Sequence, residues 1–146
     1  MNYTLRKATQ TDSLFFYEVK KIVLRKYVEA IWGWDEAFQI KFHQENYRPE
    51  LSYVIKIGNN NVGTVEIRED KASIFICSLY ILPSYQGKGL GGAIVQNCIQ
   101  QAQKEDKVVE LEVLKSNTGA KRLYERLGFK VVEELGDENK IFMRKR

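Results

Sequence analysis

Glycines are concentrated between Gln86 and Gly92, directly before an amphipathic stretch. An apolar run ends at Pro83, a short polar loop follows, and the glycines open the next expected helix. A strand, a glycine loop and a helix in this order direct several main-chain N–H groups at one point, where the helix dipole favours an anion. Glycine is required because a Cβ would hold the backbone away from a ligand and oppose turns with positive φ. The segment therefore predicts a phosphate-binding loop.

Two known kinds of phosphate loop can be compared with this segment. A Walker loop needs Ser or Thr after its lysine, and Lys88 is followed by Gly89. The dinucleotide fingerprint Gly-x-Gly-x-x-Gly does fit, at Gly87, Gly89 and Gly92. Two acids, Glu110 and Glu112, also lie roughly 20 residues on, where a ribose-binding acid would be sought. In that fold, however, the first glycine closes the strand directly, whereas residues 83–86 intervene here.

A third pattern, Gln/Arg-x-x-Gly-x-Gly/Ala, fits at Gln86, Gly89 and Gly91. A second motif follows one expected strand later. It reads Asn-x-x-Ala-x-x-x-Tyr-x-x-x-Gly-Phe and is matched at Asn117, Ala120, Tyr124, Gly128 and Phe129. Together the two motifs, in this order, resemble those of the GNAT superfamily of N-acetyltransferases, and with the strand order the resemblance covers nearly the whole chain.

Length and composition predict one globular domain over residues 1–146. The chain is 44% hydrophobic and 12% aromatic, which favours a compact protein over a disordered one. Its net charge of +4 comes from scattered, interleaved charges, so a nucleic-acid partner is not expected. The first residues turn charged before any apolar block, and the longest apolar stretch is too short to span a bilayer. We expect a cytoplasmic protein with no membrane partner, and reduced, buried thiols at Cys77 and Cys98.

Periodicity and turn signals predict the order β α α β β β α β α β β. The expected strands are 2–8, 51–57, 62–67, 73–82, 108–114, 129–135 and 141–144. The expected helices are 11–31, 35–47, 89–104 and 117–127. Helices are too few and hairpins too many for a doubly wound dinucleotide fold. The sequence therefore predicts an α+β fold with a mixed, mainly antiparallel central sheet, and the resemblance implies the GNAT arrangement, with helices on both faces.

The resemblance implies acetyl-coenzyme A as cosubstrate. Its pyrophosphate would be held by the loop of Gln86, Gly87, Lys88, Gly89, Leu90 and Gly91. The main chain near Tyr80 and Ile81 would pair with the pantetheine arm like an added strand. The strands 73–82 and 108–114 would splay apart around the thioester. Asn117 would contact the cofactor, and Tyr124 would point at its sulfur.

Two residues are candidate catalytic groups. Tyr124 would protonate the leaving thiolate, since a thiol has a pKa near 8.5 and tyrosine near 10. The alternative is that Tyr124 only contributes to an apolar helix face. Glu66, a lone acid in a strand next to the central one, would remove a proton from the attacking ammonium. The alternative is a strand residue that faces solvent.

Other residues carry weaker expectations. Trp32 and Trp34 flank Gly33 where the first two helices meet, and they either line an acceptor pocket or anchor the helix corner. Asp35 and Glu36 could attract a cationic amine or simply be first-turn helix acids. His43 is the only histidine and has no partners for a metal site, so no metal is expected.

The sequence thus predicts direct transfer of an acetyl group from acetyl-coenzyme A to a primary amine of a small molecule or peptide. The acceptor's identity is open, and homodimers are common in the resembled family. A non-catalytic module that binds acyl-coenzyme A is the alternative. A dinucleotide-dependent oxidoreductase is a third interpretation, which the hairpin turns at 58–61 and 136–139 oppose.

Overall fold

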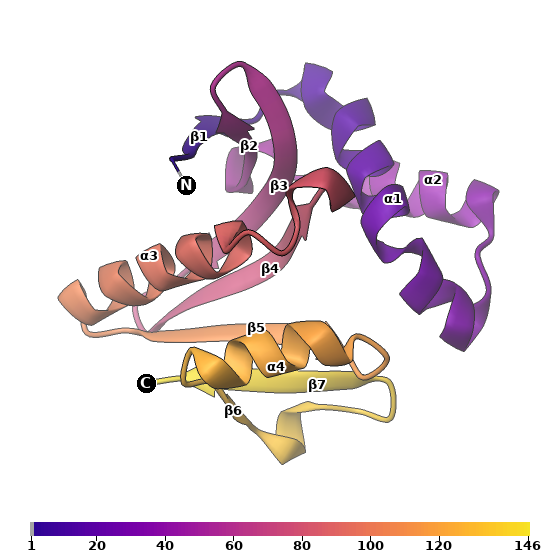
Figure 1. Cartoon of the computed structure of the whole chain (residues 1–146). Helices are drawn as coiled ribbons and strands as arrows, with labels where there is room; N and C mark the ends of the chain where they lie inside the picture. Colours follow the sequence, from indigo (N-terminus) through magenta and orange to yellow (C-terminus); the bar gives the residue numbers. More distant parts are fainter. Residues whose placement is uncertain (1) are drawn as a thin grey trace. The chain divides into compact units, whose positions relative to one another are not determined.

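The computed structural model describes residues 2–146. Its elements follow the order that the sequence predicts (Figure 1). The strands are β1 (Thr4–Lys7), β2 (Ser52–Ile57), β3 (Asn60–Glu69), β4 (Ser73–Ile81), β5 (Val108–Leu114), β6 (Lys130–Val131) and β7 (Lys140–Lys145). The α-helices are α1 (Ser13–Trp32), α2 (Glu36–Asn46), α3 (Leu90–Lys104) and α4 (Thr118–Arg126).

Within the described residues the strands form a seven-stranded sheet in the order β1-β2-β3-β4-β5-β7-β6. Strands β4 and β5 are parallel, whereas β1–β2, β2–β3, β5–β7 and β6–β7 pair antiparallel. The α+β class and the mixed, mainly antiparallel sheet are confirmed. A doubly wound dinucleotide fold would instead have a mostly parallel sheet.

The pairing of β4 with β5 is shorter than either strand. It begins at Ser73↔Val108 and its last pair is Ile76↔Leu111. Strand β4 nevertheless continues to Ile81 and β5 to Leu114. The ladder thus ends before the carboxyl ends of both strands.

The chain forms two compact units, the first made of residues 2–66 and 78–88. Its core contains Val54, Phe16 and Ala8, with Phe15 and Tyr47 packed against them. These residues come from β2, the chain after β1, α1 and the end of α2, so the two helices and the N-terminal strands share one core. Helix α1 ends at Gly33, whose φ of 77° suits glycine and whose N–H donates to the Glu29 carbonyl.

The second unit comprises residues 67–77 and 89–146. Figure 1 shows α3 and α4 on one side of β5, and both helices contact that strand. The side chains of Leu90 and Ile94 on α3, and of Leu111 and Met143 on β5 and β7, are at most 2% exposed. Burial of side chains of this size contributes about 1.5–3 kcal/mol each. This apolar layer fixes α3 against β5.

The stretch 129–135 differs from the predicted strand. Only Lys130–Val131 pairs with β7, as β6. After Val132 the chain turns into a 3-10 helix, in which the Leu135 N–H donates to the Val132 carbonyl at 3.2 Å. The Val132 N–H still donates to the Phe142 carbonyl of β7 at 2.9 Å, and beyond it local i→i+3 bonds take the place of pairing with β7.

Cys77 and Cys98 are thiols rather than a disulfide, as expected, but they are half-buried rather than buried. Among the described helices, none has the length and hydrophobicity that a bilayer crossing requires. One domain over residues 1–146 stays a prediction.

Candidate acetyl-coenzyme A site

The glycine loop runs from the end of β4 to the start of α3. Residues Pro83–Tyr85 form a 3-10 turn, after which Gly87 and Gly89 adopt φ of 74° and 84°. Side chains with a Cβ rarely adopt this left-handed region, so both turns favour glycine. Gly89 is the N-cap residue of α3, and no side chain caps this end of the helix.

The first turn of α3 exposes its main chain. An α-helix leaves its first N–H groups without intrahelical acceptors. A Cβ built at Gly87, Gly89 or Gly91 would meet no atom within 4 Å, so the space beside these backbones is open. Leu90 is 1% exposed, and its side chain points into the core. An anion can thus approach the peptide groups closely, which fits the pyrophosphate of acetyl-coenzyme A.

Gln86 has a structural role in the loop. Its Nε2 donates to the main-chain carbonyl of Ile81 at 2.7 Å, which ties the loop back to the end of β4. Lys88 is exposed, with its ammonium 5.9 Å from the centre of the Tyr85 ring. It adds a positive charge beside the open glycines.

The end of β4 lies very close to β3. A Cβ added to Gly63 would lie 2.3 Å from the carbonyl oxygen of Tyr80. The Leu82 N–H donates to the Val62 carbonyl at 2.9 Å. The carbonyl oxygen of Tyr80 therefore lies close to the backbone of β3, and the carbonyl of Ile81 is bound by Gln86. Sequence reasoning missed Gly63, although a glycine inside a strand is a known sign of close backbone approach.

Helix α4 carries the second motif. Asn117 is its N-cap, and its Oδ1 accepts from the Ala120 N–H at 3.2 Å. Tyr124 is half-buried and packs edge-on against Phe129, with ring centres 5.8 Å apart. Its hydroxyl makes no hydrogen bond within residues 2–146, yet no buried polar side-chain atom there lacks a partner, so this hydroxyl reaches solvent. Burial of the ring raises the pKa of Tyr124 above its ordinary value, which keeps the proton on at neutral pH.

The first turn of α3 and helix α4 are neighbours within the second unit. A Cβ at Gly92, in the first turn of α3, would lie 3.7 Å from Cδ1 of Leu123 on α4. Leu123 directly precedes Tyr124 in the chain. The first turn of α3 and the middle of α4 are thus within contact distance of each other.

Glu66 lies on β3 opposite Ser52 of β2 and is half-buried. Directly paired residues share a face of the sheet, so Glu66 lies on the face that carries Ser52 and Val54. Ser52 is only 1% exposed, and Val54 belongs to the core beneath α1. Glu66 is thus on a helix-covered face, not on an open polar one.

The two tryptophans differ. Trp32 is 57% exposed at the end of α1. Trp34 is half-buried, and its indole N–H donates to Oε2 of Glu36 at 2.7 Å. The structure thus fastens Trp34 in the helix corner and leaves Trp32 accessible.

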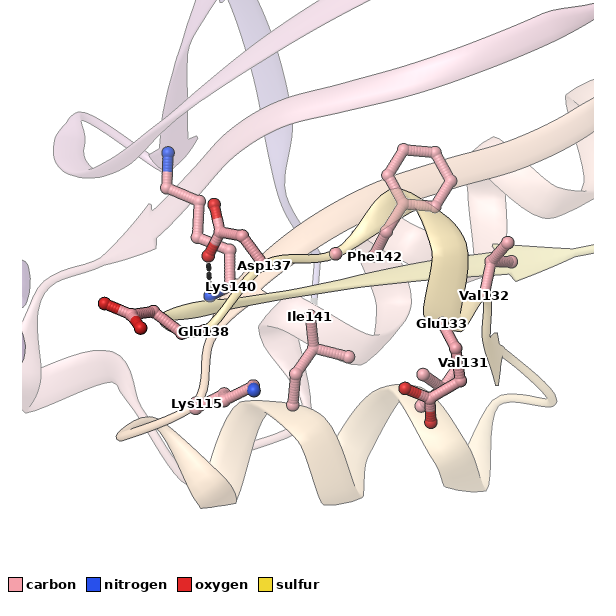
Figure 2. Close-up of a pocket in the computed structure, with 10 residues that line it drawn as sticks. Lys115, Val131, Val132, Glu133, Asp137, Glu138, Lys140, Ile141 and Phe142 are labelled. Atoms are coloured by element: carbon pink, nitrogen blue, oxygen red, sulfur yellow. Dashed lines mark hydrogen bonds between the residues drawn. The ribbon is translucent and has the colours of Figure 1, made fainter.

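A pocket of about 310 Å³ lies at the C-terminal hairpin (Figure 2). Its walls include Ile141 and Phe142 of β7 and the charged residues Lys115, Glu133, Asp137, Glu138 and Lys140. None of the predicted site residues lines it. Because acids outnumber lysines in this lining, the pocket is a poor receptor for a cofactor with several phosphates.

Within residues 2–146 no group of three or more histidine, cysteine or acidic side chains could hold a metal ion. The ring of His43 instead lies 2.9 Å from the carbonyl oxygen and 3.0 Å from the hydroxyl of Ser13. Burial lowers its pKa from the ordinary value.

Comparison with known proteins decides the family. Residues 16–129 match the sequence model of the acetyltransferase (GNAT) family. The chain belongs to the acetyltransferase (GNAT) family. The matched region contains both the glycine loop and the α4 motif, so the GNAT resemblance is confirmed.

Two GNAT relatives are named as uncharacterized N-acetyltransferases. One, from Archaeoglobus fulgidus, is 30% identical over 69% of this chain and 80% of its own length. The other, from Methanocaldococcus jannaschii, is 26% identical over 90% of this chain, which spans only 62% of that relative's length. A solved structure, the PaiA N-acetyltransferase of Thermoplasma acidophilum in complex with coenzyme A, has a TM-score of 0.79. It is 20% identical and covers 100% of this chain and 99% of its own, which shows the GNAT fold.

Proposed function

We propose that this GNAT protein transfers the acetyl group of acetyl-coenzyme A directly to a primary amine of a small molecule or peptide. The observation that carries the proposal is the pairing of the two motifs. An open, uncapped helix start lies beside α4, where the Tyr124 hydroxyl is free of protein partners. The coenzyme A complex of the Thermoplasma protein supports the choice of cosubstrate.

Binding of the cosubstrate would use the loop from Gln86 to Gly91. The first-turn N–H groups of α3 would donate to the pyrophosphate, and Lys88 would add a charge. Asn117 uses Oδ1 for the helix cap, so its Nδ2 is the group that would donate to the cosubstrate. The main chain near Tyr80 and Ile81 would hold the pantetheine arm, with main-chain N–H groups donating to the carbonyls of the arm.

Bound acetyl-coenzyme A would supply the acetyl group as a thioester. Tyr124 would donate its proton to the departing thiolate, and the proton that the amine nitrogen loses as the amide forms would return to Tyr124 through solvent. A raised pKa favours this role, because the hydroxyl stays protonated at neutral pH. Glu66 would accept a proton from the ammonium of the acceptor, which gives the amine the lone pair that attack requires.

Direct transfer is favoured over an acyl-enzyme route through Cys98. Burial raises the pKa of the Cys98 thiol to about 11. A nucleophilic cysteine needs the opposite shift, because the thiolate is the reactive form. We further propose that residues 1–146 act as one acetyltransferase domain in the cytoplasm, that Trp32 contacts the acceptor, and that the chain forms homodimers.

Two glycine variants test cosubstrate binding. Gly89→Ala and Gly58→Ala both place a Cβ at positive φ with no atom within 4 Å, so both cost similar backbone strain. Only Gly89 lies at the proposed pyrophosphate site. Acetyl-coenzyme A at 100 times its Kd should stabilise the wild type and Gly58→Ala by roughly 2.7 kcal/mol, and Gly89→Ala by much less. Equal stabilisation of all three, or stabilisation by NAD instead, would contradict the proposal.

A further inference from the structure

Helix α2 is attached to the rest of the first unit without burying any of its side chains. It spans 11 residues and none of them is buried, whereas α1 buries four. Its aromatic residues Phe38 and Phe42 stack on each other, yet they are 59% and 47% exposed. A helix without buried side chains gains little from the hydrophobic effect. Polar contacts must therefore hold α2 in place.

The first polar contact is a clamp at the start of α2. Glu36 Oε2 accepts hydrogen bonds from the Tyr17 hydroxyl at 2.9 Å and from the Trp34 indole at 2.7 Å. Glu36 Oε1 accepts from the Lys21 ammonium at 2.6 Å. Tyr17 and Lys21 lie one turn apart on α1, so one carboxylate joins α1, the corner and α2.

These donors also decide what Glu36 does. Three donors bind the two carboxylate oxygens of Glu36, so its charge is already partly balanced within the protein. The bonds from Lys21, Trp34 and Tyr17 lower the pKa of Glu36 to about 2. Its charge is thus present across the neutral range and would be lost only as the pH falls toward 2.

The second polar contact is at the other end of α2. His43 bonds to Ser13 at the start of α1, and its ring lies 5.6 Å from that of Tyr17 and 5.3 Å from that of Tyr47. Tyr47 follows α2 and packs on the core that contains Val54. Val54 and Glu66 share a face of the sheet, so α2 is connected to the face of the proposed base.

We propose that Glu36 is a positioning residue: it fastens α2 and the Trp34 corner to α1, and thereby fixes the side of the fold that receives the acceptor amine. The clamp follows from the contacts above, and its link to the acceptor rests on the proposed function. Because α2 buries no side chain, we expect this helix to open locally without unfolding of the core.

Hydrogen exchange tests the clamp without any substrate. In the wild type, amides of residues 36–46 should exchange well before those buried in α1. Glu36→Gln keeps the side-chain shape and removes the charge, so exchange in α2 should rise by about fivefold. Glu45→Gln is the matched control, because it removes the same charge from α2 and its carboxylate has no partner within residues 2–146. Wild-type protection of α2 equal to that of α1, or equal effects of both variants, would overturn the clamp.

Steady-state kinetics test the positioning role. With an amine that the wild type acetylates, Glu36→Gln should raise the KM for the amine by about fivefold and leave kcat and the affinity for acetyl-coenzyme A unchanged. Faster exchange in α2 with an unchanged KM would overturn positioning. If the wild type acetylates no amine, the proposed function fails, and the exchange comparison still decides whether Glu36 is a clamp.

Discussion

Replacement of Tyr124 by phenylalanine removes one oxygen and should separate catalysis from packing. The edge-on contact with Phe129 involves the ring alone, and the hydroxyl has no hydrogen-bond partner within residues 2–146. The free energy of unfolding should therefore change by less than about 0.5 kcal/mol. Binding of acetyl-coenzyme A should be nearly unchanged as well.

The effect on turnover follows from the role of the hydroxyl. General acid catalysis contributes about 10²–10⁴ in rate. Loss of Tyr124's proton should therefore lower kcat by at least about 100-fold, or about 2.7 kcal/mol of activation free energy. In the wild type the raised pKa of Tyr124 keeps this acid protonated, so its activity should be lost only above the ordinary tyrosine pKa of about 10.

The assay is thiol release from acetyl-coenzyme A at saturating amine, with thermal unfolding measured in parallel. Tyr53→Phe is the matched control, since it removes another hydroxyl that has no hydrogen bond within residues 2–146. An unchanged kcat in Tyr124→Phe would show that Tyr124 is only part of the core. A large loss of stability would refute the claim that its hydroxyl has no structural partner.

Two further variants test the strands that carry the site. Gly63→Ala places a Cβ 2.3 Å from the Tyr80 carbonyl, and because a main-chain oxygen cannot move alone, unfolding should become easier by about 1–3 kcal/mol. Its Tm should fall by several degrees in a thermal scan, and an unchanged Tm would mean that the strands do not approach so closely. Glu66→Gln should lower kcat/KM and shift the pH–rate profile to higher pH, because the amine must then lose its proton to solvent. An identical profile would remove Glu66 as the base.

Local signals predict the two motifs well. Turns with positive φ select glycine, which is why Gly87 and Gly89 mark the loop in the amino-acid sequence itself. Asn117 likewise indicates the start of α4, where its side chain caps the helix. The residue type at such a position is determined by the local backbone conformation. It can therefore be recognised from a few adjacent residues in the sequence.

Contacts between distant segments are less visible in the sequence. Glu36 has the position of an ordinary first-turn acid. The residues next to it in the sequence do not indicate that Tyr17 and Lys21 are its partners. The glycine at position 63 signals a close approach without identifying the Tyr80 carbonyl. The stretch 129–135 has strand-like residues, but its place at the sheet edge lets local hydrogen bonds turn the chain. These features depend on which segments meet in space.

The central claim is acetyl transfer from acetyl-coenzyme A to an amine. Its most direct test is thiol release from acetyl-coenzyme A by the wild type against a panel of small amines and peptides, with the acetylated product identified by mass spectrometry. We predict amine-dependent release with one acetylated amine formed per thiol. Binding of acetyl-coenzyme A without release for any amine would contradict the account and identify the chain as an acyl-coenzyme A binding module.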